Sequence, residues 1–422
     1  MRNTVTNKVQ GFWQVRRLLI RSALTVLMIG AGRIRKRPVI RERSRKGLHF
    51  LLTGTFYSRN WIDAQLLPLT HADGISKVTF VSSTPIADTV GIDVIYPPKL
   101  LQRLIGRVPA RLCMFFWQGV RERPDVIGGY HLLINGLFAL LIARLTKSRS
   151  LYICVGGPTE VLGGGFSTEN RIFGRLKQPD PKIERQLLSA IDTFDCVVVR
   201  GHSAKAYFEG CKIKTQIRII TAGVDPARFS PSGVRPEYDL VFLGRLSAVK
   251  RVELFLQVVE LMKQGSTPKI RALIIGDGPA RETAEKFIRN KDLESNVEMV
   301  GQQDDVASYL NAAKVFVLTS KSEGLSQAMV QAMLCGLPAV VANVGALADL
   351  VENDRGGYLI DDHSTASAYI EPIDALLGDS GKLQEMGSLA RQSALRCSVE
   401  RVADKWDRLV EEVFDVCQRT VS

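Results

Sequence analysis

The chain has 422 residues, of which 45% are hydrophobic, so its length suggests about two or three domains with packed cores. Its net charge of +13 is concentrated at one end, because residues 1–46 hold 13 of the 56 Lys and Arg residues and one of the 43 acidic residues. The remainder is nearly neutral, which excludes a nucleic-acid enzyme with a basic folded surface. Seven single cysteines without a Cys-x-x-Cys pair exclude a disulfide framework and a zinc ribbon.

Residues 1–46 contain one apolar stretch, at residues 18–32, between clusters of arginine. It is shorter than the roughly 20 apolar residues of a spanning helix, and Arg21 interrupts it. A secretory signal fits poorly because dense positive charge also follows the stretch. We interpret residues 1–46 as an interfacial helix and a polybasic segment on an anionic membrane surface. A transit peptide, a mis-assigned start and a disordered extension are the alternatives.

After residue 46, short runs rich in Val, Ile, Leu and Phe alternate with stretches of helical periodicity. The first series of expected strands is 48–53, 77–82, 92–96, 151–155, 195–200 and 216–221, with helices at 61–71, 99–119 and 133–146. The second series is 239–243, 271–275, 297–300, 314–319, 338–342 and 358–360, with helices at 250–263, 279–291, 304–312, 326–335 and 345–351. Apolar strands that alternate with helices indicate buried parallel sheets covered on both faces.

The fold class that we predict is α/β, with two doubly wound Rossmann-like domains facing a cleft and a basic N-terminal extension. We place an N-terminal domain at 47–235 and a C-terminal domain at 236–397, joined through Pro-, Gly- and Ser-rich residues. An amphipathic helix in 398–422 closes the chain and packs on it. Ligands of open α/β sheets bind beyond the carboxyl ends of the strands, so motifs at these ends are the best candidates for a site.

The strand at 239–243 leads into Gly244 and Arg245, and Lys250 stands where the next helix begins. Glycine lets the backbone approach a ligand, and free amides at a helix start favour an anion. The planar guanidinium of arginine can donate two parallel hydrogen bonds to phosphate oxygens, whereas lysine adds a point charge. Cations at a helix start oppose the helix dipole, so the motif requires a negative charge nearby.

Two further motifs follow strands of the same series. Gly276 and Asp277 begin a Gly-Asp-Gly-Pro turn, which by itself is ordinary strand-to-helix chemistry. Glu323, Gly324 and Leu325 lie between the strand at 314–319 and the helix at 326–335. An acid at a helix start often only compensates the dipole, but here it is expected at the same edge of the sheet as the basic loop.

The order Gly-Arg-Leu…Lys, Gly-Asp-Gly-Pro and Glu-Gly-Leu…Cys-Gly-Leu-Pro resembles the retaining glycosyltransferase family 4, also called group 1 glycosyltransferases, which have the GT-B fold. The resemblance covers residues 48 to about 415 and includes the motif that starts with Gly223, Val224 and Asp225. It is highly specific in the C-terminal half and looser in the N-terminal half. No residue pattern in the chain matches the Asp-x-Asp motif of metal-dependent transferases.

The resemblance implies roles for single residues. Arg245 and Lys250 would hold the donor diphosphate and stabilise charge on the leaving group, and Glu323 would face the donor sugar and phosphate. The remaining residues implied to bind the donor are Gly244, Gly276, Asp277, Gln303, Gly324, Leu325 and Gln331. Gln331 departs from the family signature, which has a second glutamate here for the ribose hydroxyls. Glutamine can still donate and accept hydrogen bonds there, so we expect altered nucleotide binding.

The N-terminal half departs further from the family. The glycine pair after the first strand is represented by Gly54 alone, and the histidine that many members have near the reacting sugar is missing beside Gly156 and Gly157. His131 is the remaining histidine candidate, although a lone histidine is more often structural. Glu160 and the glycines at 163–165 complete the expected acceptor side.

We therefore predict a retaining, metal-independent hexosyltransferase without a cofactor, which uses a UDP- or GDP-sugar as substrate. The expected acceptor is a lipid-linked or saccharide molecule in polysaccharide or glycolipid assembly, and the expected location is cytoplasmic, peripheral on the inner face of the membrane. No nucleic acid partner is expected. The alternatives are a nucleotide-sugar epimerase or a phosphorylase of the same fold, and a catalytically impaired sugar-nucleotide binding protein.

Overall fold

The computed structural model describes residues 17–26, 47–55, 59–86, 90–166, 168, 178–265 and 267–414. The chain forms two compact units. The first comprises residues 1–57, 69–220 and 403–422, and the second comprises 58–68 and 221–402. The break at residue 220 comes before the boundary expected at 235, and the C-terminal helix is shared between the units instead of forming a separate segment after 397.

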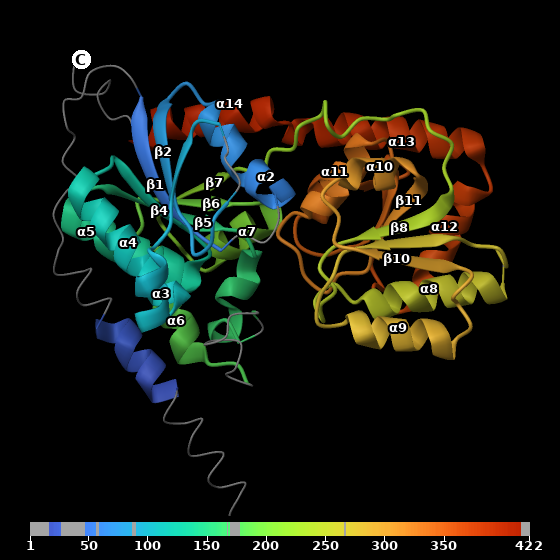
Figure 1. Ribbon diagram of the computed structural model, residues 1–422, viewed down its shortest axis with the longest axis horizontal. Coiled ribbons are helices and arrows are strands. Elements are labelled where there is room, and N and C mark those ends of the chain that lie inside the picture. The colour runs from blue at the N-terminus through green and yellow to red at the C-terminus, as the bar shows by residue number, and fades with distance from the viewer. Residues whose placement is uncertain are drawn as a thin grey trace, which may run out of the picture. The chain divides into compact units, whose positions relative to one another are not determined.

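The described part of the first unit contains a seven-stranded parallel sheet in the order β3-β2-β1-β4-β5-β6-β7. Its strands are β1 (Leu48–Thr53), β2 (Ile75–Val81), β3 (Ile92–Ile95), β4 (Val126–Tyr130), β5 (Arg149–Cys154), β6 (Cys196–Val199) and β7 (Gln216–Ile219). Its helices are α3 (Lys99–Ile105), α4 (Arg107–Glu122), α5 (Leu137–Thr146), α6 (Pro181–Ile191) and α7 (His202–Gly210), and α14 (Val399–Leu409) ends in it. Figure 1 shows this sheet among its helices.

Packing on both faces of β1 explains why its neighbouring residues Phe50 and Leu51 are both apolar. Phe50 packs edge to face against Trp406 of α14, with ring centroids 6.2 Å apart. Leu51 belongs instead to the cluster that holds Phe115 of α4 and Ile142 of α5. Successive residues of a strand point to opposite faces, so each face of the sheet is covered by different helices.

Strand β4 was absent from the expected strands because Gly128 and Gly129 lie within it. A Cβ atom on Gly129 would stand 2.6 Å from the backbone of Asn135, and one on Gly128 would stand 2.7 Å from the side chain of Leu52. These glycines therefore allow close packing inside the sheet, and β-propensity alone does not identify such a strand.

Residues 17–26 are helical and pack on the first unit. Ile20 and Leu24 are buried in the cluster that contains Leu187 of α6. Arg21 donates two hydrogen bonds to Asp180, at 2.9 and 2.8 Å. This part of the sequence was interpreted as belonging to a membrane-associating or disordered extension, but it contributes to the core. The rest of that extension lies outside the described residues, and no helix among the described ones is both long and apolar enough to cross a bilayer.

The described part of the second unit contains a seven-stranded parallel sheet in the order β10-β9-β8-β11-β12-β14-β13. Its strands are β8 (Tyr238–Leu243), β9 (Ala272–Ile275), β10 (Val297–Gly301), β11 (Ala313–Leu318), β12 (Ala339–Ala342), β13 (Glu352–Asn353) and β14 (Gly356–Ile360). Its helices are α8 (Val252–Gln264), α9 (Arg281–Asn290), α10 (Val306–Asn311), α11 (Gln327–Leu334), α12 (Ile370–Leu377) and α13 (Ser380–Ala394), and most of α2 (Arg59–Thr70) also belongs here. In Figure 1, α8 and α9 lie on one side of this sheet and α10 and α11 on the other.

Candidate functional site

The carboxyl ends of β8 and β11 bring two charged side chains of the second unit together. The Lys250 ammonium lies 2.5 Å from the Glu323 carboxylate oxygen Oε1. Ser320 donates a second hydrogen bond, of 2.6 Å, to the same oxygen. Both members of the ion pair are largely buried, with 21% of the Lys250 side chain and 10% of the Glu323 side chain exposed. The anion that the lysine at a helix start requires is therefore Glu323.

Glycines allow the basic loop and the Gly-Asp-Gly-Pro turn to lie against each other. The backbone of Gly276 has a φ of +133°, and a Cβ atom there would stand 2.0 Å from the carbonyl oxygen of Gly244. The amide of Leu246 donates to the carbonyl of Asp277 at 3.0 Å. Since no larger residue fits at Gly276, the two motifs are coupled by backbone packing.

Arg251 was not identified from the sequence, although it fixes the same corner. Its guanidinium donates to the carbonyls of Thr319 and Ser320 and to both Nδ1 and the carbonyl of His363. Its backbone has a φ of +50°, which is uncommon for a residue with a side chain. Arg251 therefore holds the segment after β11, which carries Glu323, against the start of α8.

The loop that follows Glu323 has a similar requirement for glycine. Gly345 has a φ of +62°, and a Cβ atom on it would stand 1.9 Å from the Glu323 carbonyl oxygen. The Gly324 carbonyl accepts a hydrogen bond of 2.8 Å from the amide of Ala346. The amides of Gly324 and Leu325 donate no backbone hydrogen bond among the described residues. Ser326 then caps α11 through Met329.

The other donor-side candidates have different environments. Arg245 is exposed on the loop before α8. The side chain of Asp277 is 53% exposed, accepts a hydrogen bond from the amide of Gly278 and lies 3.6 Å from Arg281. Gln303 donates to the carbonyl of Val300 at 2.7 Å. The amide of Gly276 donates to Gly301, which places the loop after β10 next to the coupled glycine turn.

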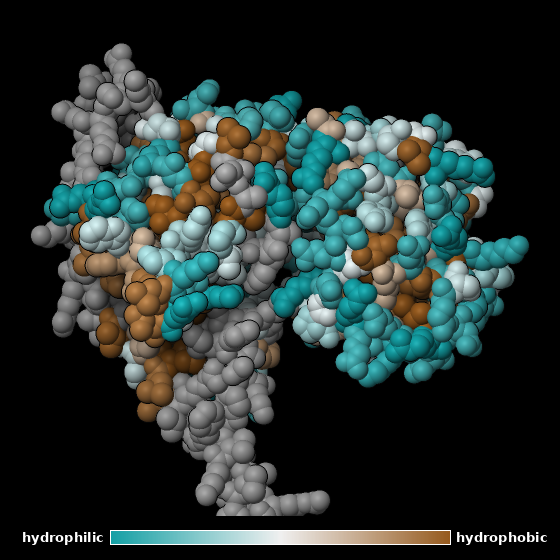
Figure 2. All heavy atoms as spheres, in the orientation of Figure 1, coloured by the Kyte–Doolittle hydropathy of each residue, from teal (hydrophilic) through white to brown (hydrophobic). Residues whose placement is uncertain are grey.

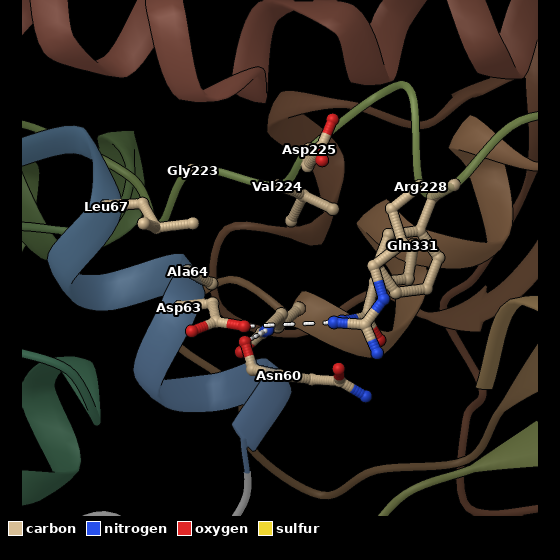
Figure 3. Close-up of a pocket in the computed structure, with 11 residues that line it drawn as sticks. Asn60, Asp63, Ala64, Leu67, Gly223, Val224, Asp225, Arg228 and Gln331 are labelled. Carbon is tan, nitrogen blue, oxygen red and sulfur yellow. Dashed lines mark hydrogen bonds and ion pairs between the residues drawn. The ribbon is translucent and has the colours of Figure 1, made fainter. Parts of the chain in front are cut away.

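Gln331 is almost fully buried on α11, with 4% exposed. It lines a cavity of about 60 Å³ together with residues of α2 and of the segment 223–229 (Figure 3). Figure 3 also shows the ion pair of 3.8 Å between Asp63 and Arg228 across this cavity. The space holds about two water molecules and is far smaller than the roughly 300 Å³ of a ligand pocket. Gln331 therefore lines a small cavity, and Glu323 and Lys250 are not among the residues that line it.

In the first unit, Glu160 is the centre of a buried hydrogen-bond network. His131 Nδ1 lies 2.9 Å from Oε1, and the Tyr152 hydroxyl donates to Oε2 at 2.9 Å. The amides of Leu132, Val155 and Gly156 also donate to this carboxylate, at 2.8, 3.1 and 2.7 Å. Only 5% of the Glu160 side chain is exposed, compared with 38% of the His131 side chain. The network thus leaves part of the His131 side chain accessible.

The two members of this pair shift each other's pKa. Burial raises the pKa of Glu160, but the positive charge of His131 and the backbone hydrogen bonds outweigh burial and lower it. Burial lowers the pKa of His131, but the Glu160 carboxylate outweighs it and raises the pKa. The His131 backbone has a φ of +65°, which is uncommon outside glycine. A histidine–carboxylate pair with shifted pKa values, on an uncommon backbone conformation at a strand end, is typical of a functional position.

Gly54, Gly156 and Gly157 also lie at carboxyl ends of strands in the first unit. The buried guanidinium of Arg111 donates to the Gly54 carbonyl and, at 2.7 Å, to Oδ1 of Asn135. Gly156 approaches the Glu160 side chain, and Gly157 has a φ of +67°. Arg111 was missed from the sequence because an arginine on an amphipathic helix normally indicates the solvent side.

No group of three or more His, Cys, Asp and Glu side chains among the described residues is arranged to hold a metal ion. Among the site residues predicted from the sequence, the structure brings together the Lys250–Glu323 pair in the second unit and the His131–Glu160 pair in the first.

Residues 227–393 match the family model described as "Glycosyl transferases group 1". Residues 227–393 therefore form a group 1 glycosyltransferase domain within the second unit. Similar curated proteins include N-acetyl-alpha-D-glucosaminyl L-malate synthase of Bacillus anthracis, which is 24% identical over 70% of this chain and 76% of the relative. A GalNAc-alpha-(1->4)-GalNAc-alpha-(1->3)-diNAcBac-PP-undecaprenol alpha-1,4-N-acetyl-D-galactosaminyltransferase of Campylobacter jejuni is 26% identical over 55% of this chain and 65% of the relative.

The whole chain also has a fold known from solved structures. The Anabaena protein Alr3699/HepE, solved in complex with UDP-glucose, superposes with a TM-score of 0.67 at 16% identity and covers 86% of this chain and 100% of its own. The two seven-stranded α/β units therefore have the GT-B fold, as the sequence predicted. This chain spans about a third to a half of the length of two other similar proteins. The likeness therefore extends to the family and the fold and not to a particular substrate.

Proposed function

We propose that this glycosyltransferase moves a hexose-type sugar from a nucleotide-diphosphate donor with retention of configuration and without a metal ion. The Lys250–Glu323 pair, with Arg245 on the same loop, carries the proposal. The donor diphosphate would take the place of Glu323 as the counter-anion of Lys250, and Arg245 would bind its oxygens. Glu323 would then be released to the sugar, where the amides of Gly324 and Leu325 would bind hydroxyl groups.

The chemistry of this transfer requires electrostatic stabilisation more than a strong base. The bond between the anomeric carbon and the diphosphate oxygen breaks, and negative charge grows on the leaving phosphate. The acceptor hydroxyl attacks from the same face of the sugar, and its proton goes to that phosphate oxygen. A preorganised charged donor at such an oxygen is typically worth about 3–4 kcal/mol, which Lys250 and Arg245 would supply.

The donor is proposed to be a UDP- or GDP-sugar, and UDP-glucose is bound in the Anabaena relative. A thermal-shift screen of the full chain against UDP-, GDP-, ADP- and dTDP-sugars tests this. Free donor at about 100 times Kd stabilises the folded state by about 2.7 kcal/mol, so one base should raise the melting temperature clearly above the others. An unchanged melting temperature with every nucleotide sugar would contradict the proposal.

Gln331 is proposed to bind the donor ribose, which the family resemblance implies. In that role Gln331→Leu raises the donor KM with little change in kcat, because ribose contacts are equally strong in the ground state and the transition state. The buried position of Gln331 is also compatible with a role in stability alone. In that role Gln331→Leu lowers the melting temperature and leaves the donor KM unchanged. Steady-state kinetics on Gln331→Leu and Gln331→Glu, with melting curves of both, separate the two roles.

The acceptor is proposed to be lipid-linked or a saccharide, used on the inner face of the membrane. The name of the Campylobacter jejuni relative includes an undecaprenol diphosphate, and residues 1–46 of this chain carry nearly all of its excess positive charge. His131 and Glu160 are proposed to lie on the acceptor side, where the imidazole would bind an acceptor hydroxyl or phosphate. This assignment is tested by the pH dependence of transfer in Glu160→Gln.

A second candidate function is sugar-nucleotide binding without turnover. The observation that favours it is Gln331, which replaces an acid of the family signature and is buried. Release of free nucleotide diphosphate from the donor in the absence of acceptor separates the candidates, because a transferase hydrolyses its donor slowly and a binding protein does not.

A further inference from the structure

Helix α3 (Lys99–Ile105) has an apolar sequence, yet none of its residues is buried. Leu100 and Leu104 are 69% and 72% exposed, and Ile105 is 43% exposed. A helix of a monomeric protein normally buries its apolar stripe against the core. The protein's own described residues therefore do not explain why α3 is apolar.

Helix α4 (Arg107–Glu122) has apolar residues on two faces. The inner face packs Ala110, Phe115 and Gly119 against the sheet. Val108, Phe116, Trp117 and Val120 are 41%, 43%, 54% and 43% exposed. Phe116, Trp117 and Val120 follow a helical spacing that places them away from the buried Phe115 and Gly119, and Val108 is exposed in the first turn of the helix. The core accounts for the inner face of α4 but not for the outer one.

The exposed apolar residues of α3 and α4 form a surface that we call the α3–α4 face. Figure 2 shows hydrophobic side chains gathered over this part of the first unit. It consists of Leu100, Leu104, Ile105, Val108, Phe116, Trp117 and Val120. Apolar patches of this kind on soluble proteins mark sites of interaction with proteins, ligands or membranes.

The charge around the α3–α4 face selects among these partners. Exposed basic residues stand on the same two helices or directly after them, and we call them the basic rim: Lys99, Arg103, Arg107, Arg121 and Arg123. Glu122 is the one acid in residues 99–123, and it is bound to Lys77 at 3.1 Å. The Arg121 guanidinium also lies 6.0 Å from the Trp117 ring centroid. A basic rim would repel an identical face in a symmetric dimer, whereas it would attract anionic headgroups.

We infer that the α3–α4 face docks on the surface of an anionic bilayer. The apolar side chains of both helices would enter the boundary between headgroups and acyl chains, and the basic rim would contact lipid phosphates. Trp117 suits such a boundary because an indole ring is amphipathic. The inference rests on the proposed membrane location, but it assigns the contact to the folded first unit in addition to the basic extension.

Flotation of the full chain with lipid vesicles tests the inference. Vesicles of phosphatidylcholine with phosphatidylglycerol should bind the protein, and vesicles of phosphatidylcholine alone should bind it weakly. The double variant Leu104→Gln/Trp117→Gln should lower the partition coefficient at least about tenfold, because it removes two large apolar groups from the bilayer. Its melting temperature should stay close to that of the parent, since both side chains are exposed.

A matched control comes from the second unit. Val234 and Leu395 are 60% and 39% exposed there, so Val234→Gln/Leu395→Gln changes surface hydropathy without touching the α3–α4 face. It should float as the parent does. A third variant, Leu18→Gln/Leu19→Gln, alters the exposed side of the helical segment 17–26. If only this third variant lost binding, the extension would be the contact and the inference would be wrong.

Two further readouts separate this inference from other possibilities. Light scattering of the parent and of Leu104→Gln/Trp117→Gln should give the same oligomeric state, and a dimer lost in the variant would show that a second copy covers the face. Donor hydrolysis should be unchanged in the variant, because both residues belong to the first unit and the proposed diphosphate site, with Lys250 and Glu323, belongs to the second. Loss of flotation with normal hydrolysis supports docking, whereas absence of hydrolysis in the parent would contradict the proposed function alone.

Discussion

Replacing Lys250 or Arg245 by alanine is expected to lower turnover by about a hundredfold or more while the second unit stays folded. Both residues are proposed to stabilise the charge that grows on the leaving diphosphate, an interaction stronger in the transition state than in the ground state. Lys250→Ala also removes the partner of the Glu323 carboxylate, which is 10% exposed. Initial rates at saturating donor, together with circular dichroism and melting curves, measure the effect.

Lys314 provides a matched control for this prediction. Its ammonium lies 2.8 Å from Asp239, so the same second unit contains another lysine–carboxylate pair. That pair joins the beginnings of β8 and β11, whereas Lys250 and Glu323 follow the ends of these strands. Lys314→Ala should leave turnover nearly unchanged. Equal turnover in Lys314→Ala, Lys250→Ala and Arg245→Ala would show that Lys250 and Arg245 do not bind the diphosphate.

A double-mutant cycle with Glu323→Gln refines the assignment. Lys250 and Glu323 share one ion pair, so their effects should be strongly non-additive, and the double variant should be little worse than the poorer single variant. Additive losses would mean that the two residues act on separate parts of the substrate. The cycle therefore tests the coupling that the distance of 2.5 Å indicates.

The Lys250–Glu323 pair could be anticipated from sequence because the topology of a parallel sheet brings strand ends together. Both residues follow apolar runs that are recognisable as strands, and adjacent parallel strands end at one edge. Two cations at a helix start also required an anion nearby, and Glu323 meets that requirement for Lys250. The sequence was sufficient to predict this pair because each motif is local, and the order of the parallel strands brings the two motifs together.

Contacts that depend on the packing of distant residues could not be predicted in this way. Arg21 looked like an interruption of an apolar membrane segment, but its partner Asp180 lies far along the chain. The sequence alone does not distinguish Arg111 from other helix arginines, but it is buried and donates to Gly54 and Asn135. A buried charge has no periodicity of its own, so its role is visible only once its partners are placed.

Replacing Glu160 by alanine is expected to destabilise the first unit by about 3–5 kcal/mol. The change leaves buried donors without an acceptor, including the Tyr152 hydroxyl and the amides of Leu132 and Gly156. Each unsatisfied donor costs about 1–3 kcal/mol, partly relieved by relaxation and water. Hydrogen exchange of peptides from residues 126–160 measures the loss locally, which avoids a two-state assumption for a chain of two units.

Glu160→Gln should keep part of the network and change its response to pH. The Glu160 carboxylate raises the pKa of His131, so the pair's stabilisation is present below the ordinary pKa of histidine and fades as pH rises through the raised one. The pKa of Glu160 is lowered, so the same stabilisation is lost only when pH falls through that lower value. The first unit should therefore gain most from the pair in weakly acidic solution, and the variant should lose this dependence.

Histidine NMR resonances of the parent and of Glu160→Gln measure this directly, and His131→Ala identifies the signal. In the variant, His131 should titrate at a lower pH, because it is still buried while the negative charge of Glu160 is gone. Glu184→Gln is the control, since Glu184 also accepts from a glycine amide and a tyrosine hydroxyl but does not contact His131. If the pH profile of sugar transfer moves with the His131 titration, the imidazole acts on the acceptor side. If the titration moves and the profile does not, the pair only supports the fold.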